Sequence, residues 1–458
     1  MEQYILKYLY DSTSDSAMRR LMDYCKFQLD SRLWSAGRHM PYSYDTQRDL
    51  AEFRSRSSQS LRSRCRAKIQ QVKSLFVRPR EEVLYDDFPK QKQTNQSYAV
   101  WSFVDIPLES RKRLENEGIE YYYTNVYASR LSGYITPALV EIHQWYESYI
   151  CNAPFNEIIK PQNAAYLERL YHQLVDELRA LPIDAVLVRT SELFFEKLMI
   201  DAFREIGKPS ITLLHGMPGI YTLATESRAD YLLVWGEKIK ENFIKVGYNP
   251  SRVFVGGNYK YDVMPSHEML RTSLDDVLVL TSAPFAEHQH EWEWNKFDIQ
   301  DRGLLITYLY SIENVLKKCG VKHARLRPHP AVNKEWLKEY IDIDFYEIDR
   351  SDFIQSLTQA TLCVGQISST LLEALMCGVT YIPYEPSENG KVGMGKATIV
   401  PPFDGSEKTL RVAYSEDQLY DMIIQKYSPN TFDMQAWMQG FDAHEIKMIL
   451  EKAKAKND

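Results

Sequence analysis

From Tyr98 onward, short apolar segments alternate along the chain with stretches whose apolar residues have helical spacing. One series contains AVLVRT, SITLLHG, YLLVWG and RVFVGG, and a second begins with VLVLTSAP and continues to a segment that ends at Arg327. Strands that alternate with helices are joined by right-handed crossovers, which build parallel sheets. The pattern therefore predicts an α/β protein with two Rossmann-like domains, whose boundary is expected near residues 255–275.

The length of 458 residues exceeds the size of one ordinary core, which supports two domains. We expect a helical, basic N-terminal extension over residues 1–95 and a first Rossmann-like domain over 96–262. A second Rossmann-like domain is expected over 263–435. A C-terminal helix within 436–458 can then cross back onto the first domain.

The composition is 44% hydrophobic and 26% charged, as in a folded soluble protein. A formal net charge of −7 argues against general nucleic-acid binding. No apolar run is long enough to span a bilayer, and the opening MEQYILKYLY lacks the layout of a signal peptide. The six cysteines have no metal-ligand spacing, so neither a disulfide framework nor a zinc site is expected. A cytoplasmic protein is predicted.

Basic side chains recur through residues 54–80, where nine arginines and lysines accompany Val72, Leu75 and Phe76. Two interpretations are open. A basic amphipathic helix makes peripheral contact with an anionic membrane surface, which would place the protein at the inner face of the membrane. A solvated helical face is the commoner meaning of such a pattern.

Two motifs in the second half indicate an anionic ligand. Residues 323–330 read HARLRPHP and end an expected strand on Arg325, Arg327 and His329, which Pro328 and Pro330 hold in place. Residues 363–378 read CVGQISSTLLEALMCG, in which hydroxyl residues precede a helix. Hydroxyls at a helix start can cap it, and with the free N–H groups they can also hold a phosphate. Each motif alone favours a simple cap or strand exit, but together they favour a nucleotide-like ligand.

Polar residues also follow several expected strands. Glu192, His215, Ser282 and His329 each come directly after one, as do the hydroxyls of residues 368–370. Ligands of open parallel sheets bind beyond the carboxyl ends of the strands. The shared location indicates a binding site.

These residues carry a family resemblance that covers roughly residues 180–400. His329-Pro330 and Ser368-Ser369 resemble the His-Pro and Ser-Ser/Thr motifs of bacterial sialyltransferases, polysialyltransferases and capsule Kdo transferases, which are GT-B enzymes that use CMP-activated sugars. KPSITLLHGMPG at residues 208–219 resembles the CDP-glycerol phosphotransferases. A GT-B fold implies two Rossmann-like domains that face a cleft, the first for the acceptor and the second for the nucleotide-sugar donor.

The resemblance also implies roles for individual residues. The donor nucleotide and its phosphate would contact a set at the strand ends and helix start of the second domain: Arg327, His329, Pro330, Ser368, Ser369, Thr370, Glu373 and Ser282. Within this set, Glu373 would reach the ribose. GNYKYD at 257–262 resembles a segment of Kdo transferases where the chain passes into the second domain.

Two residues are candidates for the general base. His215 matches the histidine of the CDP-glycerol enzymes, whereas the sialyltransferase-like families use an acidic base, for which Glu192 is placed. The acidic motif of those families is absent from the first domain, so the choice stays open. No metal is expected, because a helix start with Arg and His can replace the cation, and the DxD-like Asp342-Ile343-Asp344 lacks the usual surroundings.

The predicted function is that of an inverting, metal-independent glycosyltransferase without cofactor. It would move a sialic-acid-like or Kdo-like sugar from a CMP-activated donor to a glycan or glycolipid acceptor of the bacterial surface or capsule. A CDP-glycerol-type phosphotransferase and a UDP-sugar glycosyltransferase are the alternatives. A non-catalytic nucleotide-binding paralogue is the alternative of another class.

Overall fold

The computed structural model describes residues 2–26, 28–29, 85–92, 97–127, 131–151, 153–222, 226–261, 269–281, 302–329, 332, 334–386 and 399–457. The chain divides into two compact units. The helical unit comprises Met1–Lys90 and Tyr122–Leu181, and the two-sheet unit comprises Gln91–Tyr121 and Pro182–Asp458. Residues 54–80 lie outside the described residues, as do Ser282 and Pro330.

The first sheet of the two-sheet unit is parallel, with the strand order β2-β5-β6-β7-β8. The start of β3 (Ile119–Asn125) lies on the other side of β2. Val186 of β5 is opposite both Trp101 and Ser210, which sets the register. The strands are β2 (Tyr98–Ser102), β5 (Ala185–Val188), β6 (Ser210–Leu213), β7 (Tyr231–Val234) and β8 (Val253–Val255). Their connections are α6 (Leu108–Asn116), α10 (Phe194–Glu205), α11 (Glu237–Lys245) and the 3₁₀ turn η2 (Pro250–Arg252).

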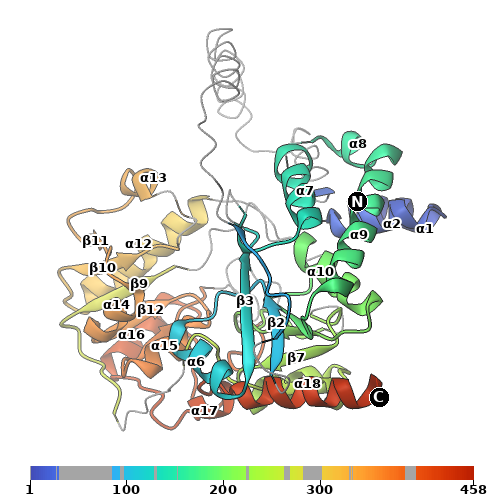
Figure 1. Ribbon diagram of the computed structural model, residues 1–458. Coiled ribbons are helices and arrows are strands. Elements are labelled where there is room, and N and C mark those ends of the chain that lie inside the picture. The colour runs from blue at the N-terminus through green and yellow to red at the C-terminus, as the bar shows by residue number, and fades with distance from the viewer. Residues whose placement is uncertain are drawn as a thin grey trace. The chain divides into compact units, whose positions relative to one another are not determined.

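The second sheet is also parallel, with the order β11-β10-β9-β12-β13 (Figure 1). Its strands are β9 (Val277–Leu280), β10 (Ala324–Arg327), β11 (Tyr346–Ile348), β12 (Leu362–Gly365) and β13 (Tyr381–Pro383). Its helices are α12 (Arg302–Lys318), α13 (Lys334–Lys338), α14 (Phe353–Gln359), α15 (Thr370–Met376) and α16 (Glu416–Ile424).

Each sheet has a point at which the strand order reverses. In the second sheet the chain builds outward from β9 through β10 to β11, and then returns to the other side of β9 with β12. In the first sheet the reversal lies between β2 and β5. Crevices at such points, beyond the carboxyl ends of the strands, are where open α/β sheets bind ligands.

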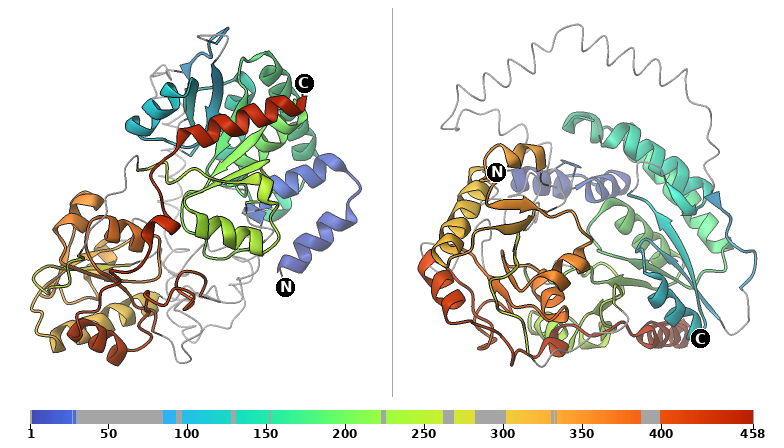
Figure 2. Two further views of the ribbon diagram at one scale, coloured as in Figure 1. Left: turned by 90° about the horizontal axis from the view of Figure 1, so that it is seen from below. Right: turned by 90° about the vertical axis from the view of Figure 1, so that its left-hand side faces the viewer.

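The C-terminal segment returns to the first sheet. After α17 (Met434–Trp437), the helix α18 (Ala443–Asn457) lies along this sheet, as Figures 1 and 2 show. The apolar residues Ile446 and Ile449 of α18 share a buried cluster with Val100, Ala185 and Ile211 of the strands. Helix α18 therefore completes the buried core of the first sheet.

A turn at residues 256–261, called here the 256–261 turn, links the two sheets. Its Asn258 is fully buried and donates its backbone N–H to the carbonyl of Gln439 at 2.9 Å. Gly257 has φ of +70°, and a Cβ atom there would lie 2.1 Å from the carbonyl oxygen of Gly440. Only glycine combines this backbone conformation with so close an approach of another chain segment.

The helical unit is built mainly by α2 packed on α9. Arg20 donates to Glu168 at 2.5 Å, and its guanidinium lies 3.9 Å from the centre of the Tyr171 ring. The helices are α1 (Glu2–Ser12), α2 (Ser16–Tyr24), α7 (Pro137–Trp145), the π-helix η1 (Tyr146–Ile150), α8 (Phe155–Ile158) and α9 (Pro161–Ala180). Strand β4 (Ser132–Tyr134) pairs parallel with β1 (Tyr85–Asp86) and antiparallel with β3.

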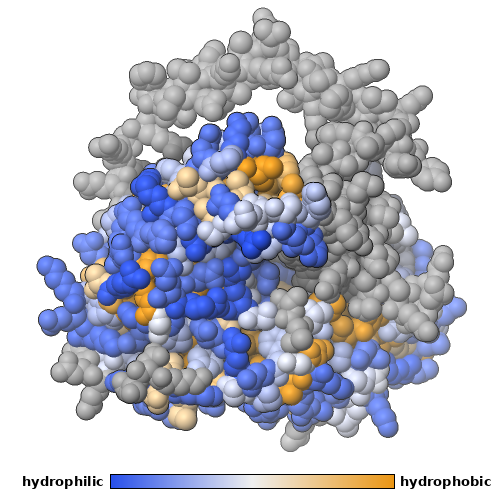
Figure 3. Space-filling model, turned by 90° about the vertical axis from the view of Figure 1, so that its right-hand side faces the viewer, coloured by the Kyte–Doolittle hydropathy of each residue, from blue (hydrophilic) through white to orange (hydrophobic). Residues whose placement is uncertain are grey.

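On the face drawn in Figure 3, hydrophilic side chains predominate and apolar ones form small separate groups. Over the described part of the chain, no helix combines the length and the apolar character needed to cross a bilayer.

The predicted fold class is confirmed, because the structure has two Rossmann-like parallel sheets with helical connections. The strands are shorter than the apolar segments suggested: SITLLHG contributes only Ser210–Leu213. The antiparallel pairing of β3 with β4 was not predicted, because β4 is three residues long and carries no apolar pattern.

Replacement of Gly257 by Ala is expected to destabilise the two-sheet unit strongly, because the added Cβ meets the Gly440 carbonyl. Gly207→Ala is the matched control, since Gly207 has φ of +73° but no atom within 4 Å of its would-be Cβ. Gly207→Ala should cost about 1 kcal/mol from backbone conformation, and Gly257→Ala about 1–3 kcal/mol more from overlap. Urea denaturation measures both, and equal losses would show that the contact with Gly440 is unimportant.

Candidate functional site

Polar residues of the first sheet gather at its reversal point. Residues 189–192 follow β5, and His215 follows the neighbouring β6. Asp105 follows β2 on the other side of the reversal point and forms an ion pair with Arg111 at 2.6 Å. The structure thus places the two predicted bases, Glu192 and His215, after adjacent strands.

His215 is held in one orientation by its neighbours. Its Nδ1 lies 3.0 Å from the carbonyl oxygen of Arg189, so Nδ1 carries the hydrogen in that contact and Nε2 is available as an acceptor. The preceding Leu214 is buried, and its carbonyl accepts from the indole of Trp235 at 2.6 Å. His215 is exposed to solvent, but neighbouring protein atoms partly desolvate its imidazole. This desolvation lowers the pKa of His215, and the charges of Arg189 and Lys260 lower it further.

The half-buried Glu192 belongs to a turn whose hydrogen bonds are local. Its backbone N–H donates to Thr190 Oγ1 at 3.3 Å, and Ser191 donates to its carboxylate at 3.5 Å. Glu226 supplies a second carboxyl group that fixes the same turn. It accepts from the Thr190 hydroxyl at 2.9 Å and from the Ser191 N–H at 2.7 Å.

Glu226 has three unusual properties. Its side chain is 6% exposed, and its φ of 57° lies in the left-handed region that a glutamate rarely adopts. Burial raises its pKa from 4.5 to about 8, and the nearby charges of Glu192 and Glu196 add to the shift. A buried carboxyl group with so strongly raised a pKa is a candidate functional residue. Sequence reasoning missed it because TES at 225–227 has no motif, and only the tertiary structure reveals the burial.

In the second sheet, the predicted donor residues follow three adjacent strands, β10, β9 and β12. His329 is half-buried two residues beyond β10, and its backbone N–H donates to Thr281 Oγ1 at 3.1 Å. Burial lowers the pKa of His329. Thr281, directly after β9, therefore joins the set, although sequence reasoning selected its neighbour Ser282, which lies outside the described residues.

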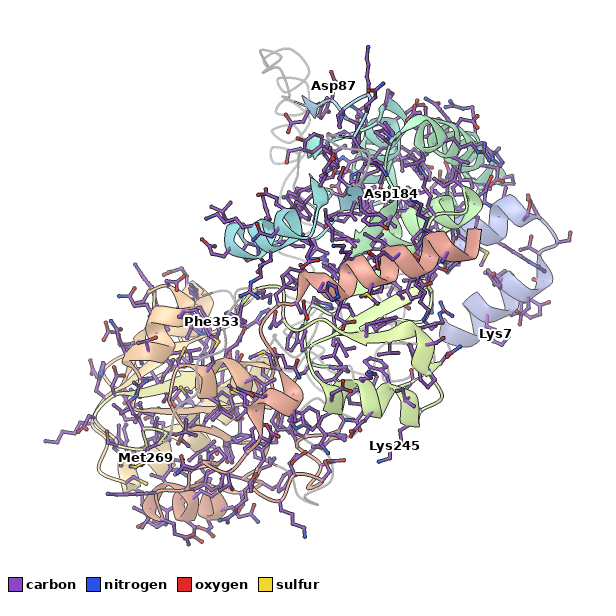
Figure 4. The ribbon with its side chains drawn as sticks, turned by 60° about the horizontal axis from the view of Figure 1, so that its bottom comes forward. Lys7, Asp87, Asp184, Lys245, Met269 and Phe353 are labelled. Atoms are coloured by element: carbon purple, nitrogen blue, oxygen red, sulfur yellow. The ribbon has the colours of Figure 1, made fainter. Side chains whose placement is uncertain are left out.

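Arg327 is engaged within the fold. Its Nη1 donates to the carbonyl of Ser351 at 2.6 Å and to Ser356 Oγ at 3.0 Å. The guanidinium also lies 5.3 Å from the centre of the ring of Phe353, the residue at the start of α14 that Figure 4 labels. Arg325 is similarly occupied, with Asp276 at 2.7 Å. These contacts hold the β10 side of the sheet to the start of α14.

The hydroxyls before α15 bond mainly to one another. Ser368 Oγ lies 3.1 Å from Thr370 Oγ1 and accepts from the Thr370 N–H at 3.3 Å, whereas Ser369 makes no side-chain capping bond. The preceding Ile367 N–H donates to the buried carboxylate of Glu385 at 2.6 Å. Glu385 follows β13, so a carboxylate beyond that neighbouring strand holds the backbone of the loop before α15.

Glu373 connects the second sheet to the 256–261 turn. Tyr261 donates its hydroxyl to Glu373 Oε1 at 2.7 Å. Burial raises the pKa of Glu373, while the hydrogen bond from Tyr261 and the charge of Lys260 oppose that shift. Leu214, which precedes His215, and Ile367, which precedes Ser368, belong to one buried apolar cluster. The Tyr261–Glu373 bond is thus a direct contact between the 256–261 turn and α15 of the second sheet.

No protein-family model matches this chain, and no curated protein sequence matches it. Among solved structures, the UDP co-structure of MnaA from S. aureus aligns with 77% of this chain and 96% of that chain, at 13% identity and a TM-score of 0.47. A putative UDP-N-acetylglucosamine 2-epimerase from Listeria monocytogenes aligns with 79% and 97%, at 15% identity and a TM-score of 0.47. The Methanocaldococcus jannaschii UDP-GlcNAc 2-epimerase with UDP-GlcNAc and UDP aligns with 78% and 100%, at 14% identity and a TM-score of 0.44. Likenesses of this degree do not identify an activity.

Replacement of Glu226 by Gln should make the protein progressively more stable than the wild type as the pH rises from 5 to 8. The folded carboxyl stays protonated up to its raised pKa of about 8, whereas the unfolded one ionises near 4.5. The wild type therefore loses stability with rising pH in that window, at about 1.4 kcal/mol per pH unit, and an amide does not.

Urea denaturation at several pH values measures this difference. Glu115→Gln, which changes an exposed carboxylate on α6, is the control and should show no comparable trend. A constant difference between wild type and Glu226→Gln across the window would mean that Glu226 is already ionised in the folded protein.

Proposed function

We propose that this protein is a glycosyltransferase that binds a nucleotide-sugar at the second sheet and an acceptor at the first. The observation that carries the proposal is the Tyr261–Glu373 hydrogen bond, which joins the 256–261 turn to the helix beside Ser368, Ser369 and Thr370. The bond joins the turn after β8, the edge strand of the first sheet, to the proposed donor helix of the second sheet. Two sets of strand ends suit two substrates, as a transfer reaction requires.

The reaction needs a base for the acceptor hydroxyl and a stabiliser for the departing phosphate. His215 is assigned the first role, because its Nε2 is left as an acceptor when Nδ1 bonds the Arg189 carbonyl. Glu192 remains the alternative. His329, the N–H groups before α15 and the hydroxyls of 368–370 are assigned the second. Arg327 contributes its charge rather than a direct contact, since its guanidinium is bonded to the start of α14.

The donor that we propose is CMP-linked, with a sialic-acid-like or Kdo-like sugar and a glycan or glycolipid acceptor of the cell surface. The support is the pairing of His329-Pro330 with Ser368-Ser369. Transfer would proceed with inversion and without a metal ion. The second candidate, a CDP-glycerol-type phosphotransferase, is favoured specifically by the placement of His215. Incubation with CMP-, CDP- and UDP-linked donors, followed by measurement of nucleotide release, separates these from each other, from a UDP-sugar transferase and from a non-catalytic protein.

His329→Ala should weaken nucleotide binding by about 10- to 100-fold, because a hydrogen bond to a charged phosphate contributes about 1.5–3 kcal/mol. The double change Ser368→Ala with Ser369→Ala should act in the same direction. His323→Ala is the matched control: His323 is exposed and precedes β10, at its amino end. Calorimetry with CMP, CDP and UDP measures affinity, and circular dichroism verifies folding. Equal affinity of His329→Ala and His323→Ala for every nucleotide would remove His329 from the site.

His215→Ala should lower kcat by about 10²- to 10⁴-fold with nucleotide affinity unchanged, as expected for loss of a general base. The wild-type rate should rise with pH as the imidazole loses its proton. Burial and the charges of Arg189 and Lys260 lower this pKa, so the rise should be centred below the ordinary value of about 6.5. Glu192→Gln tests the carboxylate alternative, and wild-type turnover in both variants would exclude both residues.

A further inference from the structure

The backbone around Lys260 is fixed at several points. Lys260 donates its backbone N–H to Asn258 Oδ1 at 3.1 Å, and Tyr261 donates its own to the Asn258 carbonyl at 2.9 Å. Asn258 is itself anchored, since its N–H bonds the Gln439 carbonyl and it forms a parallel β-bridge with Gly440. A lysine at this position projects from a rigid turn.

The residues on either side of Lys260 face protein, whereas Lys260 does not. Tyr259 is 7% exposed, and Tyr261 is held by its bond to Glu373 and by the Phe441 N–H, which donates to its carbonyl at 2.8 Å. Lys260 is exposed. Within the described residues, its ammonium group makes no hydrogen bond or ion pair. By contrast, the exposed Lys238 of α11 pairs with Glu241 at 3.6 Å.

The charge of Lys260 acts on residues of both sheets. It lowers the pKa of His215, which follows β6, and also that of Glu373 in α15, whose hydroxyl partner is the neighbouring Tyr261. Lys260 also directly precedes Tyr261, whose hydroxyl bonds Glu373 at 2.7 Å, so it lies one residue from a direct contact with the proposed donor helix. Arg189 adds a second positive charge near His215.

A cation in this position suits a phosphate group. Glu373 accepts from the Tyr261 hydroxyl and, within the described residues, forms no ion pair with Lys260. A lysine ammonium binds phosphate as a compact point charge, and a fixed positive charge stabilises the negative charge that forms on a leaving group. Next to the proposed donor helix, that group is the phosphate attached to the transferred sugar.

We propose that Lys260 contacts the sugar-linked phosphate of the donor and acts as a catalytic residue that stabilises its departure; this rests on the function proposed above. In the step, the bond between the anomeric carbon and the phosphate oxygen breaks, and its electron pair stays on the phosphate. The acceptor oxygen forms the new bond to carbon and gives its proton to the general base. Lys260 remains protonated throughout and lowers the energy of the phosphate as its charge grows.

The test uses the full-length protein with Lys260→Ala, Lys260→Arg and, as the matched control, Lys238→Ala. Calorimetry with CMP, CDP and UDP measures nucleotide affinity, and turnover is measured with the corresponding donors. Lys260→Ala should reduce kcat by about 10²-fold or nucleotide affinity by about tenfold, as for the loss of one preorganised donor. Lys260→Arg should recover part of the loss, and Lys238→Ala should match the wild type. Because Lys260 is exposed, the substitutions leave the core intact, which circular dichroism verifies.

The outcomes separate this inference from the proposed function. If the wild type transfers a sugar and Lys260→Ala does so at the same rate and affinity, the function stands and the role of Lys260 is overturned. If the wild type binds nucleotide through Lys260 but transfers nothing from any donor, the phosphate contact stands and the glycosyltransferase proposal fails. Absence of any nucleotide binding by the wild type overturns both.

Discussion

The pairing of the 256–261 turn with residues 437–442 determines where the chain can place everything else in the two-sheet unit. The pairing depends on Asn258, a fully buried amide whose side chain bonds its own turn and whose backbone bonds Gln439. Asp442 adds a bond from its N–H to the Gly256 carbonyl at 2.9 Å. A buried polar group left without a partner costs about 1–3 kcal/mol. Another arrangement of the two segments would leave polar groups of Asn258 without partners, so few other arrangements are stable. This pairing also fixes the positions of Lys260 and Tyr261, which belong to the same turn.

The first-sheet side of the site combines a histidine that favours its neutral form with an acid that favours its neutral form. Both preferences arise from burial, which penalises charge. A protonated Glu226 spares the site a further negative charge beside Glu192 and Glu196, while its carboxyl group still orders Thr190 and Ser191. The turn that presents Arg189 and Glu192 is therefore supported without adding repulsion.

Sequence reasoning succeeded where local pattern determines structure. AVLV, YLLV and VLVL are short apolar runs that are buried on both faces, as central parallel strands require, and each became a strand. The placement of His215 and His329 after strands followed from two other segments, which became Ser210–Leu213 and Ala324–Arg327. The roles assigned to these residues are predictions that the fold alone does not test.

The missed features depend on contacts between distant parts of the chain. In the sequence, Glu226 is an ordinary polar residue. Its role in the fold depends on hydrogen bonds with Thr190 and Ser191, which lie 36 and 35 positions away in the sequence. The Tyr261–Glu373 bond spans 112 positions. Arg327 was assigned to a ligand because the motif shows a cation at a strand end, but not the Ser351 carbonyl that receives it. Contacts between residues so far apart along the chain produce no periodic pattern in the sequence.

The packing of α18 on the first sheet has a consequence for how the protein is made. A ribosome produces the strands of that sheet first and then the whole second sheet, and only afterwards the helix that carries Ile446, Ile449 and Leu450 into the first core. During that interval the apolar surface around Val100 and Ile211 lacks its cover, and such surface is prone to aggregation. The first sheet therefore gains part of its core only after α18 has been synthesised.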